Sequence, residues 1–219
     1  MRYGNIEVSE EMYRFLHFKI TQVIRDINDC FKISFNDITF KEIQKYYEEK
    51  FNYTYADYPL SDKAYIIAGS LVRGENGKIV IGINVNSNIS KEKQNLTKMH
   101  ETTHGLMHTK SNLHSQNFSK ILNYFAYSES EQRDEAEADF GALIFMINDM
   151  ALYNHIIKEH SFKFLCQKFG IDSPSLALRL KLFLHYNCGL SEATSHLFIS
   201  RFIEGYNIPL LNTFKQRSF

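Results

Sequence analysis

The first third of the chain shows the spacing of hydrophobic residues that is typical of amphipathic helices. Apolar residues recur every three or four positions between residues 9 and 29, and Ser9 stands where an N-cap is expected. The same spacing predicts a second helix over about residues 39–50, with either Asp37 or Thr39 as its cap. Both helices carry one apolar and one polar face, which is typical of helices that pack onto a core.

The next segments change from a helical pattern to a strand-like one. Residues 51–62 are rich in tyrosine and turn residues, so we expect a loop over the core. Residues 63–73 and 78–85 are rich in β-forming residues and flank the turn sequence Gly-Glu-Asn-Gly, which predicts a β-hairpin. Gly82 interrupts the second strand, and two interpretations remain open. It marks either a sheet edge where a substrate strand adds, or a bulge or packing site.

The rest of the chain is predicted to be mostly helical. Helices are expected at about residues 90–108 and 118–127, and a capping box at 128–131 starts a helix that is acidic at first and strongly apolar afterwards. Residues 149–207 have helical patterns throughout, and residues 212–219 look like a short tail. The expected fold class is therefore α+β, mostly helical with a small sheet built on the hairpin.

Composition indicates an ordinary globular protein. The 219 residues carry a formal net charge of zero, with 44% hydrophobic and 23% charged residues. This balance gives no electrostatic argument for binding nucleic acid or an anionic membrane. No apolar run approaches the roughly 20 residues that span a bilayer, and the N-terminus lacks the pattern of a signal peptide. The three cysteines lie far apart without a CxxC motif, so we expect a cytoplasmic protein with reduced thiols.

The candidate chemistry lies in the predicted helix 90–108, which contains the motif HExxH. His100 and His104 are four residues apart, so both imidazoles can face one metal ion. Glu101 lies beside the first histidine, where its carboxylate can reach a water on the metal. Zinc suits two imidazoles plus a carboxylate with an open fourth position, and HExxH on a helix is the signature of metalloproteases. The alternative is a structural helix that carries two solvated histidines.

A third ligand is expected from the acidic helix that begins near residue 128. Small residues there, such as Gly141, allow the close helix–helix approach that a shared metal site requires. Glu135 and Asp139 are four residues apart and share a face, so Glu135 can ligate zinc while Asp139 accepts a hydrogen bond from one of the two histidines. Glu137 points about 200° away from Glu135 at ~100° per residue, and is therefore the fallback ligand.

The segments HETTHGLMH and EAEADFGALIFM together resemble the two motifs of the ImmA/IrrE family of metallopeptidases. The resemblance covers about residues 60–150. It implies a zincin-like (gluzincin) domain over residues 1–150, Zn²⁺ as the cofactor, and Glu135, the first glutamate of the second motif, as the third ligand. The sequence departs from the family pattern at Thr102-Thr103, which replace Leu-Gly, and in lacking the proline that ends the second motif. Neither departure removes a predicted ligand.

Residues 151–219 are expected to form a helical C-terminal subdomain that resembles a helix-turn-helix unit. The sequence Asp-Ser-Pro at 172–174 predicts the start of its second helix. That helix carries only two basic residues, Arg179 and Lys181, whereas phosphate binding needs several. Packing or recognition of a protein is therefore preferred over DNA binding.

These expectations combine into a zinc-dependent endopeptidase in which Glu101 is the catalytic general base. Several residues are candidates for a second donor to the oxyanion, namely Tyr65, Tyr124, Tyr127 and His108. The family resemblance implies a specific helix-turn-helix repressor as the protein substrate, and no membrane partner is expected. One alternative is a non-proteolytic, zinc-containing module that sequesters a regulator. Another is a DNA-binding regulator, which the neutral charge disfavours.

Overall fold

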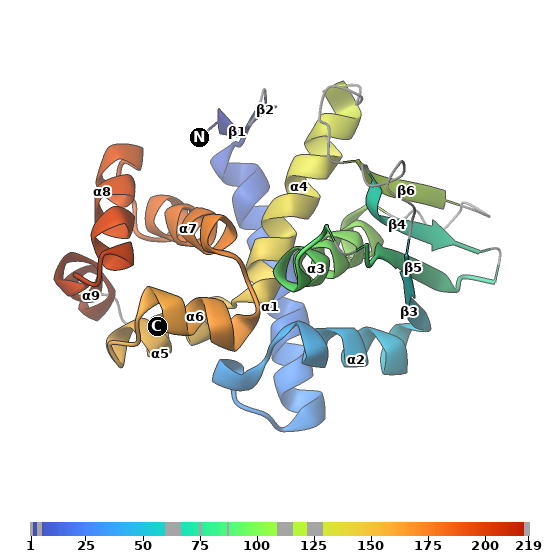
Figure 1. The fold of residues 1–219 in the computed structure, drawn as a ribbon, viewed down its shortest axis with the longest axis horizontal. Coiled ribbons are helices and arrows are strands. Elements are labelled where there is room, and N and C mark those ends of the chain that lie inside the picture. Colours follow the sequence, from blue (N-terminus) through green and yellow to red (C-terminus); the bar gives the residue numbers. More distant parts are fainter. Residues whose placement is uncertain are drawn as a thin grey trace.

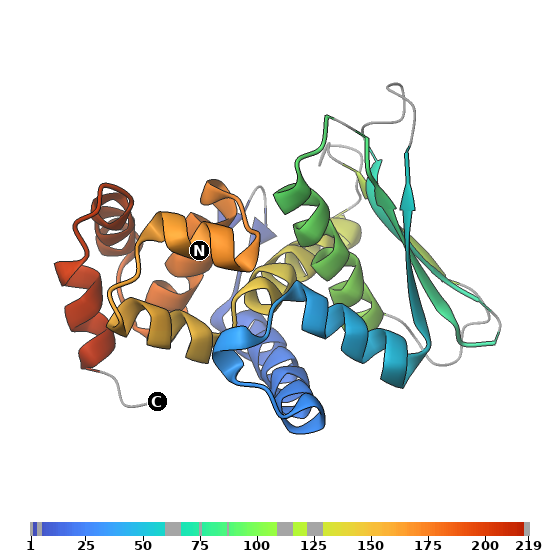
Figure 2. The same ribbon diagram turned by 60° about the horizontal axis from the view of Figure 1, so that its bottom comes forward.

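The computed structural model describes most of the chain, namely residues 2–3, 6–59, 67–74, 76–86, 88–108, 116–121 and 129–216. This part is an α+β structure in which helices predominate, as the sequence predicts. Its elements form successive layers (Figures 1 and 2). A small sheet is followed by helix α3 (Lys91–Met107), then by the crossing helices α1 (Glu10–Phe31) and α4 (Glu129–Met146), and finally by a group of C-terminal helices.

Capping residues set the beginnings of the first two long helices. Helix α1 begins after Ser9, whose hydroxyl accepts a hydrogen bond from a backbone N–H of the first turn. Helix α2 (Phe40–Phe51) begins after Thr39, which takes part in a capping box. Both predicted helices are thus confirmed. The cap of the second is Thr39 and not Asp37, which ends the short 3₁₀ helix η1 (Phe35–Asp37).

The main sheet contains these strands: β3 (Tyr53–Tyr58), β4 (Ile67–Arg73), β5 (Ile79–Asn84) and β6 (Gln116–Ile121). Their order across the sheet is β3–β5–β4–β6. Strands β4 and β5 form the predicted antiparallel hairpin, β3 runs parallel to β5, and β6 is antiparallel to β4. A separate short pair, β1 (Arg2–Tyr3) and β2 (Ile6–Glu7), lies near the N-terminus.

Two expectations about strands are wrong, and the structure decides between the two interpretations of Gly82. The expected loop 51–62 contains β3, because its tyrosines and threonine suit a strand and β5 supplies a distant parallel partner. The described part of the expected helix 118–127, residues 118–121, belongs to strand β6, since antiparallel pairing with β4 outweighs the helical spacing. Gly82 lies inside the sheet and not at an edge, because β5 is flanked by β3 and β4. A Cβ there would meet Ser70 and Tyr58 at 3.2 Å, so the packing interpretation holds.

The C-terminal region consists of consecutive helical elements: α5 (Asp149–Ile157), α6 (Phe162–Phe169), α7 (Ser173–Leu182), the π-helical turn η4 (Phe183–Asn187), α8 (Glu192–Ile203) and α9 (Ile208–Lys215). Gly170 ends α6 with a φ of +58°, and Asp172 caps α7, as predicted. The prediction of a tail at 212–219 is wrong for residues 212–215. They belong to α9, whose Phe214 is buried in the core.

The basic residues of α7 are engaged within the protein. Arg179 is fully buried, its Nε donates a hydrogen bond to the carbonyl of Ile147 at 2.9 Å, and its guanidinium pairs with Asp149. Lys181 forms an ion pair with Glu192 at 2.8 Å. A helix whose two basic side chains are held in this way offers little charge for contacts with phosphates.

Within the described parts of the chain, no single helix combines the length and the apolar character that crossing a membrane requires. One bent pair, Glu131–Met146 with Asp149–Ile157, meets both conditions jointly and is kinked by 48°. Its larger apolar side chains, such as Phe140, Phe145 and Leu152, are buried in the core of the protein.

Helices α3 and α4 approach each other closely because of a glycine. A Cβ on Gly141 of α4 would lie 2.3 Å from the Cγ2 atom and 2.7 Å from the Oγ1 atom of Thr103 on α3. Thr103 has no room to yield, since it is fully buried and its hydroxyl donates to the carbonyl of Met99 at 2.8 Å. A second glycine, Gly105, lets the side chain of Tyr53 on β3 approach α3, since a Cβ there would lie 2.3 Å from the Tyr53 hydroxyl oxygen. Helix α3 is therefore held between α4 and the sheet (Figure 2).

We expect Gly141→Ala to lower the free energy of unfolding by ~1–3 kcal/mol, the usual cost of overpacking. The added methyl group would have to push α3 and α4 apart. Urea unfolding measures the loss. Combining the change with Thr103→Ala removes both atoms that lie under 3.0 Å from the new methyl, so the double variant should recover part of the loss. Strictly additive losses would contradict the close approach as the cause.

Candidate metal centre

Helix α3 directs two histidines toward one point. His100 and His104 lie one turn apart on the same face, and their Nε2 atoms are 3.0 Å from each other. Both side chains are 1% exposed. The turn between them is anchored to the sheet, because the hydroxyl groups of Tyr55 on β3 and Thr102 are hydrogen-bonded at 2.8 Å. The two imidazoles are therefore buried and held by packing on both sides of α3.

The carboxylate of Glu135 on α4 completes the group. Its Oε2 atom lies 3.3 Å from Nε2 of His100, and its Oε1 atom lies 3.2 Å from Nε2 of His104. Among the described residues, these three form the one set of His, Cys, Asp or Glu side chains whose ligand atoms all lie within 4.8 Å of one another. The structure thus brings together the three residues that the sequence predicts as metal ligands.

The distances between the two imidazoles and the carboxylate are close to those between ligands of an ion of the size of zinc. Ligand bonds of about 2.0–2.1 Å at tetrahedral angles separate neighbouring ligand atoms by ~3.3 Å. Here the two Nε2 atoms are 3.0 Å apart, and the carboxylate of Glu135 approaches them at 3.2 Å through Oε1 and at 3.3 Å through Oε2. Two imidazoles and one carboxylate are also the donor set of several catalytic zinc sites, in which water takes the fourth position. The buried group could therefore hold a metal ion.

Burial keeps the second histidine in the form that binds metals. Desolvation lowers the pKa of His104 from 6.5 to about 4, and the hydrogen bond with Glu135 opposes this shift only in part. The neighbouring imidazoles of His100 and His108 contribute to this lowering. Because a metal is bound by the neutral imidazole, His104 can act as a ligand at neutral pH without first losing a proton.

Asp139 supports His100 directly. Its Oδ1 atom lies 2.8 Å from Nδ1 of His100, so the carboxylate can accept the Nδ1 hydrogen and leave Nε2 directed at Glu135. The sequence left open which histidine pairs with Asp139, and the structure selects His100. Glu135 and Asp139 lie one turn apart on α4, as the helix-face argument requires.

His104 is supported through a residue to which sequence analysis gave no such role. Nδ1 of His104 lies 2.9 Å from Nδ1 of His108, and Nε2 of His108 lies 3.3 Å from Oε2 of Glu137. The hydrogen bond with His108 lowers the pKa of Glu137 below its ordinary value, against the effect of burial. Glu137 therefore faces His108 and lies outside the ligand group. The sequence signal was the four-residue spacing of the last two histidines of HETTHGLMH.

Glu101, the candidate general base, is fully buried beside strand β4. A Cβ on Gly69 would lie 3.2 Å from Oε1 of Glu101 and 2.5 Å from the methyl group of Thr97. Only a residue without a side chain fits at this point of the strand. The backbone of β4 consequently approaches the Glu101 carboxylate, which lies between the histidine helix and the sheet.

Several residues singled out in the sequence lie outside the described part of the chain. Tyr65, Tyr124 and Tyr127, three of the candidate oxyanion donors, lie outside the described residues, and so does the predicted cap Ser128. The fourth candidate, His108, contacts His104 through Nδ1 and an α4 carboxylate through Nε2. Its position supports a role behind the ligands, because both of its ring nitrogens are engaged there.

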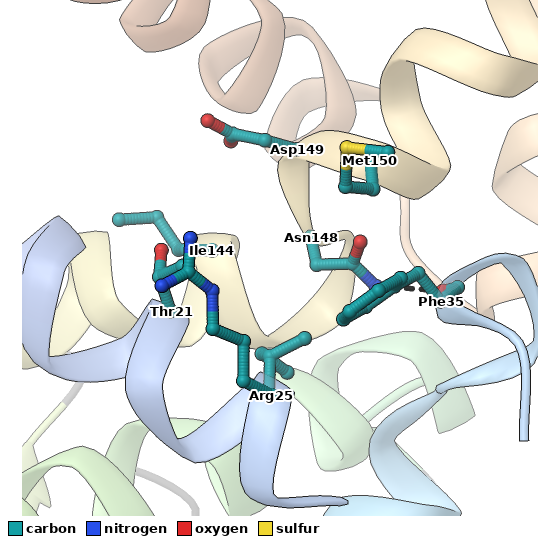
Figure 3. A pocket seen from close by; sticks show the side chains of 8 residues that line it. Thr21, Arg25, Phe35, Ile144, Asn148, Asp149 and Met150 are labelled. Atoms are coloured by element: carbon teal, nitrogen blue, oxygen red, sulfur yellow. Dashed lines mark hydrogen bonds between the residues drawn. The ribbon is translucent and has the colours of Figure 1, made fainter. Parts of the chain in front are cut away.

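A separate cavity of about 70 Å³ lies where α1 meets the junction of α4 and α5 (Figure 3). Thr21 and Arg25 line it from α1, and Asn148 lines it from the junction, where its amide donates to the carbonyl of Phe35 at 2.9 Å. The lining includes none of the candidate ligands. Since ligand pockets typically measure ~300–1,000 Å³, this cavity is too small to serve as a substrate site.

Comparison with known proteins assigns the chain to no family: no protein-family model, no curated protein and no solved structure matches it.

Proposed function

We propose that this chain is a zinc-dependent endopeptidase of the ImmA/IrrE type with a zincin-like fold. The proposal is carried by one observation, the buried group of His100, His104 and Glu135 at the contact of two helices, whose ligand atoms all lie within 4.8 Å of one another. A chance HExxH motif on a structural helix would have no reason to meet a buried carboxylate from another helix, because burying such a charge is costly unless it is paired or bound to a metal.

In this proposal the ligands and the proton carrier are separate residues. A bound zinc would lower the pKa of a water molecule and polarise the scissile carbonyl. Glu101 takes the proton from the attacking water and delivers it to the leaving amine. Asp139 keeps Nε2 of His100 directed inward by accepting its Nδ1 hydrogen. The burial of Glu101 and of the ligands strengthens each of these charge interactions by limiting access of bulk water.

The proposed substrate is a DNA-binding repressor or regulator of the helix-turn-helix type, as the family resemblance implies. The C-terminal helices favour recognition of a protein over direct binding of DNA, because Arg179 is buried and Lys181 is paired. A non-proteolytic module that sequesters such a regulator is the competing function. Cleavage of a partner separates the two.

The ligand assignment can be tested by the zinc content of the wild type and two variants. We expect about one zinc per chain in the wild type and in Glu137→Gln after loading with excess zinc and desalting, and little zinc in Glu135→Ala. Elemental analysis gives the stoichiometry. Glu137→Gln tests the fallback ligand, and it leaves the three proposed ligands in place, since Glu137 lies on the same helix but contacts His108 instead of the ligand group.

Two outcomes would contradict this prediction. Loss of zinc in the Glu137 variant alone would move the third ligand to Glu137 while leaving the metalloenzyme class intact. A wild-type protein that retains no zinc after loading would refute the metal site, and with it the endopeptidase.

A further inference from the structure

The two proposed histidine ligands are supported in different ways, although both paths end at a carboxylate of α4. His100 contacts the carboxylate of Asp139 directly, at 2.8 Å. His104 contacts another imidazole, that of His108, at 2.9 Å, and His108 in turn contacts Glu137 at 3.3 Å. The three acidic residues of the E-A-E-A-D segment thus have different neighbours: Glu135 faces both histidines, Glu137 faces His108, and Asp139 faces His100.

Metal binding would fix the position of every proton along the path from His104 through His108 to Glu137. If Nε2 of His104 offers its lone pair to the ion, the ring proton must reside on Nδ1. Nδ1 of His108 then accepts that hydrogen, so His108 carries its own proton on Nε2 and donates it to Glu137. Glu137 also accepts a hydrogen bond from Nε of Arg133 at 3.2 Å. Each donor on this path meets one acceptor, and no proton is left without a partner along it.

His108 and Glu137 are placed to support a metal ligand and not to bind the metal themselves. His108 lies at the C-cap of α3, one turn beyond His104 on the same face, and its side chain is 9% exposed. The Glu137 side chain is 15% exposed and accepts from both His108 and Arg133. A carboxylate that accepts from an imidazole fixes the tautomer of that imidazole and limits its rotation. Through His108, this effect would extend to His104.

We propose that His108 and Glu137 are positioning residues that fix the tautomer and the ring orientation of His104. The inference rests on the proposed zinc site and extends it, since it assigns the third histidine of HETTHGLMH and the second glutamate of EAEAD to the metal centre. Neither residue touches the ion. Both act through the Nδ1 atom of His104.

The test compares two substitutions of His108 that differ in one feature. In His108→Asn, the side-chain oxygen occupies approximately the position of Nδ1 and can still accept from His104. In His108→Leu, side-chain volume is kept and the acceptor is removed. We expect the zinc dissociation constant, measured by competition with a chromophoric chelator, to rise ~10–100-fold in the leucine variant, as for other residues that support metal ligands. In the asparagine variant the zinc dissociation constant should rise only a few-fold.

Thermal unfolding of the metal-free proteins controls for damage to the fold. If both variants unfold as the wild type does and only His108→Leu binds zinc weakly, the positioning role stands. Equal zinc affinity in His108→Leu and the wild type would overturn it, and so would an equal weakening in both variants. Tight binding by the wild type with no effect of His108→Leu would refute this inference alone, whereas no binding by the wild type would refute the proposed function as well.

Discussion

Replacing Glu101 with glutamine is expected to remove peptide-bond cleavage while leaving zinc bound. Glutamine has nearly the same shape as glutamate but cannot take a proton from water at neutral pH. A general base contributes typically ~10²–10⁴-fold to a rate, so the loss should be at least of that order. Zinc should stay, because Glu101 lies outside the group formed by His100, His104 and Glu135.

The measurement has two stages, because the natural substrate has first to be found. A cell extract from the source organism is incubated with the wild type or with Glu101→Gln, and new amino termini are identified by mass spectrometry. A peptide that spans the mapped site then gives the rate for each protein. Elemental analysis and a thermal unfolding curve confirm that the variant keeps its zinc and its fold.

Each result of this comparison has one meaning. New termini with the wild type and none with Glu101→Gln would support both the endopeptidase and the role of Glu101. The same termini at the same rate with both proteins would refute the general base. No new termini with zinc-loaded wild type would favour the module that binds a regulator without cleaving it.

Local signals were sufficient to predict the long helices and the ligand group. Ser9 and Thr39 cap their helices through hydrogen bonds within a single turn, which depend on residues close in sequence. The pairs His100–His104 and Glu135–Asp139 follow from the geometry of one turn of helix. That α3 and α4 meet could be anticipated from small residues such as Gly141, because the glycine is what permits their contact.

Features that depend on distant partners were not predictable in this way. Strand β3 exists because β5, which follows it after another strand, pairs with it in parallel, and β6 exists because β4 offers a free side. Similarly, the spacing of His108 from His104 places the two on one face of the helix but does not reveal the partner of His108 on α4. Its role depends on the rotation of α4, which directs Glu137 toward it.

The least predictable feature is a polar cluster around Asp149 that joins the C-terminal helices to the N-terminal half of the protein. Asp149 accepts hydrogen bonds from Arg179 on α7 and from the side-chain amide of Asn187 on η4, and it contacts Nε2 of His17 on α1 at 2.7 Å. Burial works against the charge of Asp149, but Arg179 and His17 outweigh it and hold the pKa of this carboxyl below its usual range. Its partners come from elements far apart in sequence, so no sequence window contains the pattern.

This cluster leads to the largest expected effect on stability. Arg179→Met keeps most of the buried volume but removes the guanidinium, which pairs with Asp149 and donates to the carbonyl of Ile147. Breaking a buried pair by removing one partner costs ~3–5 kcal/mol, because the other charge stays buried. For a chain of this size that corresponds to a melting temperature lower by roughly 6–20 °C. Calorimetry of the zinc-loaded protein measures the change.

Two further variants separate the charge from other effects. Arg201→Met on α8 is the matched control, since Arg201 is exposed and a surface change should cost less than ~0.5 kcal/mol. The double variant Arg179→Met with Asp149→Leu removes both charges, and replacing a buried pair by apolar side chains is often neutral or stabilising. It should therefore melt at a higher temperature than Arg179→Met alone.

If the double variant were less stable than Arg179→Met, the contacts of Asp149 with His17 and Asn187 would be the main link between the two halves of the protein. If Arg179→Met melted like Arg201→Met, the pairing of Arg179 with Asp149 would contribute no stability, and the attachment of the C-terminal helices would rest on their other contacts.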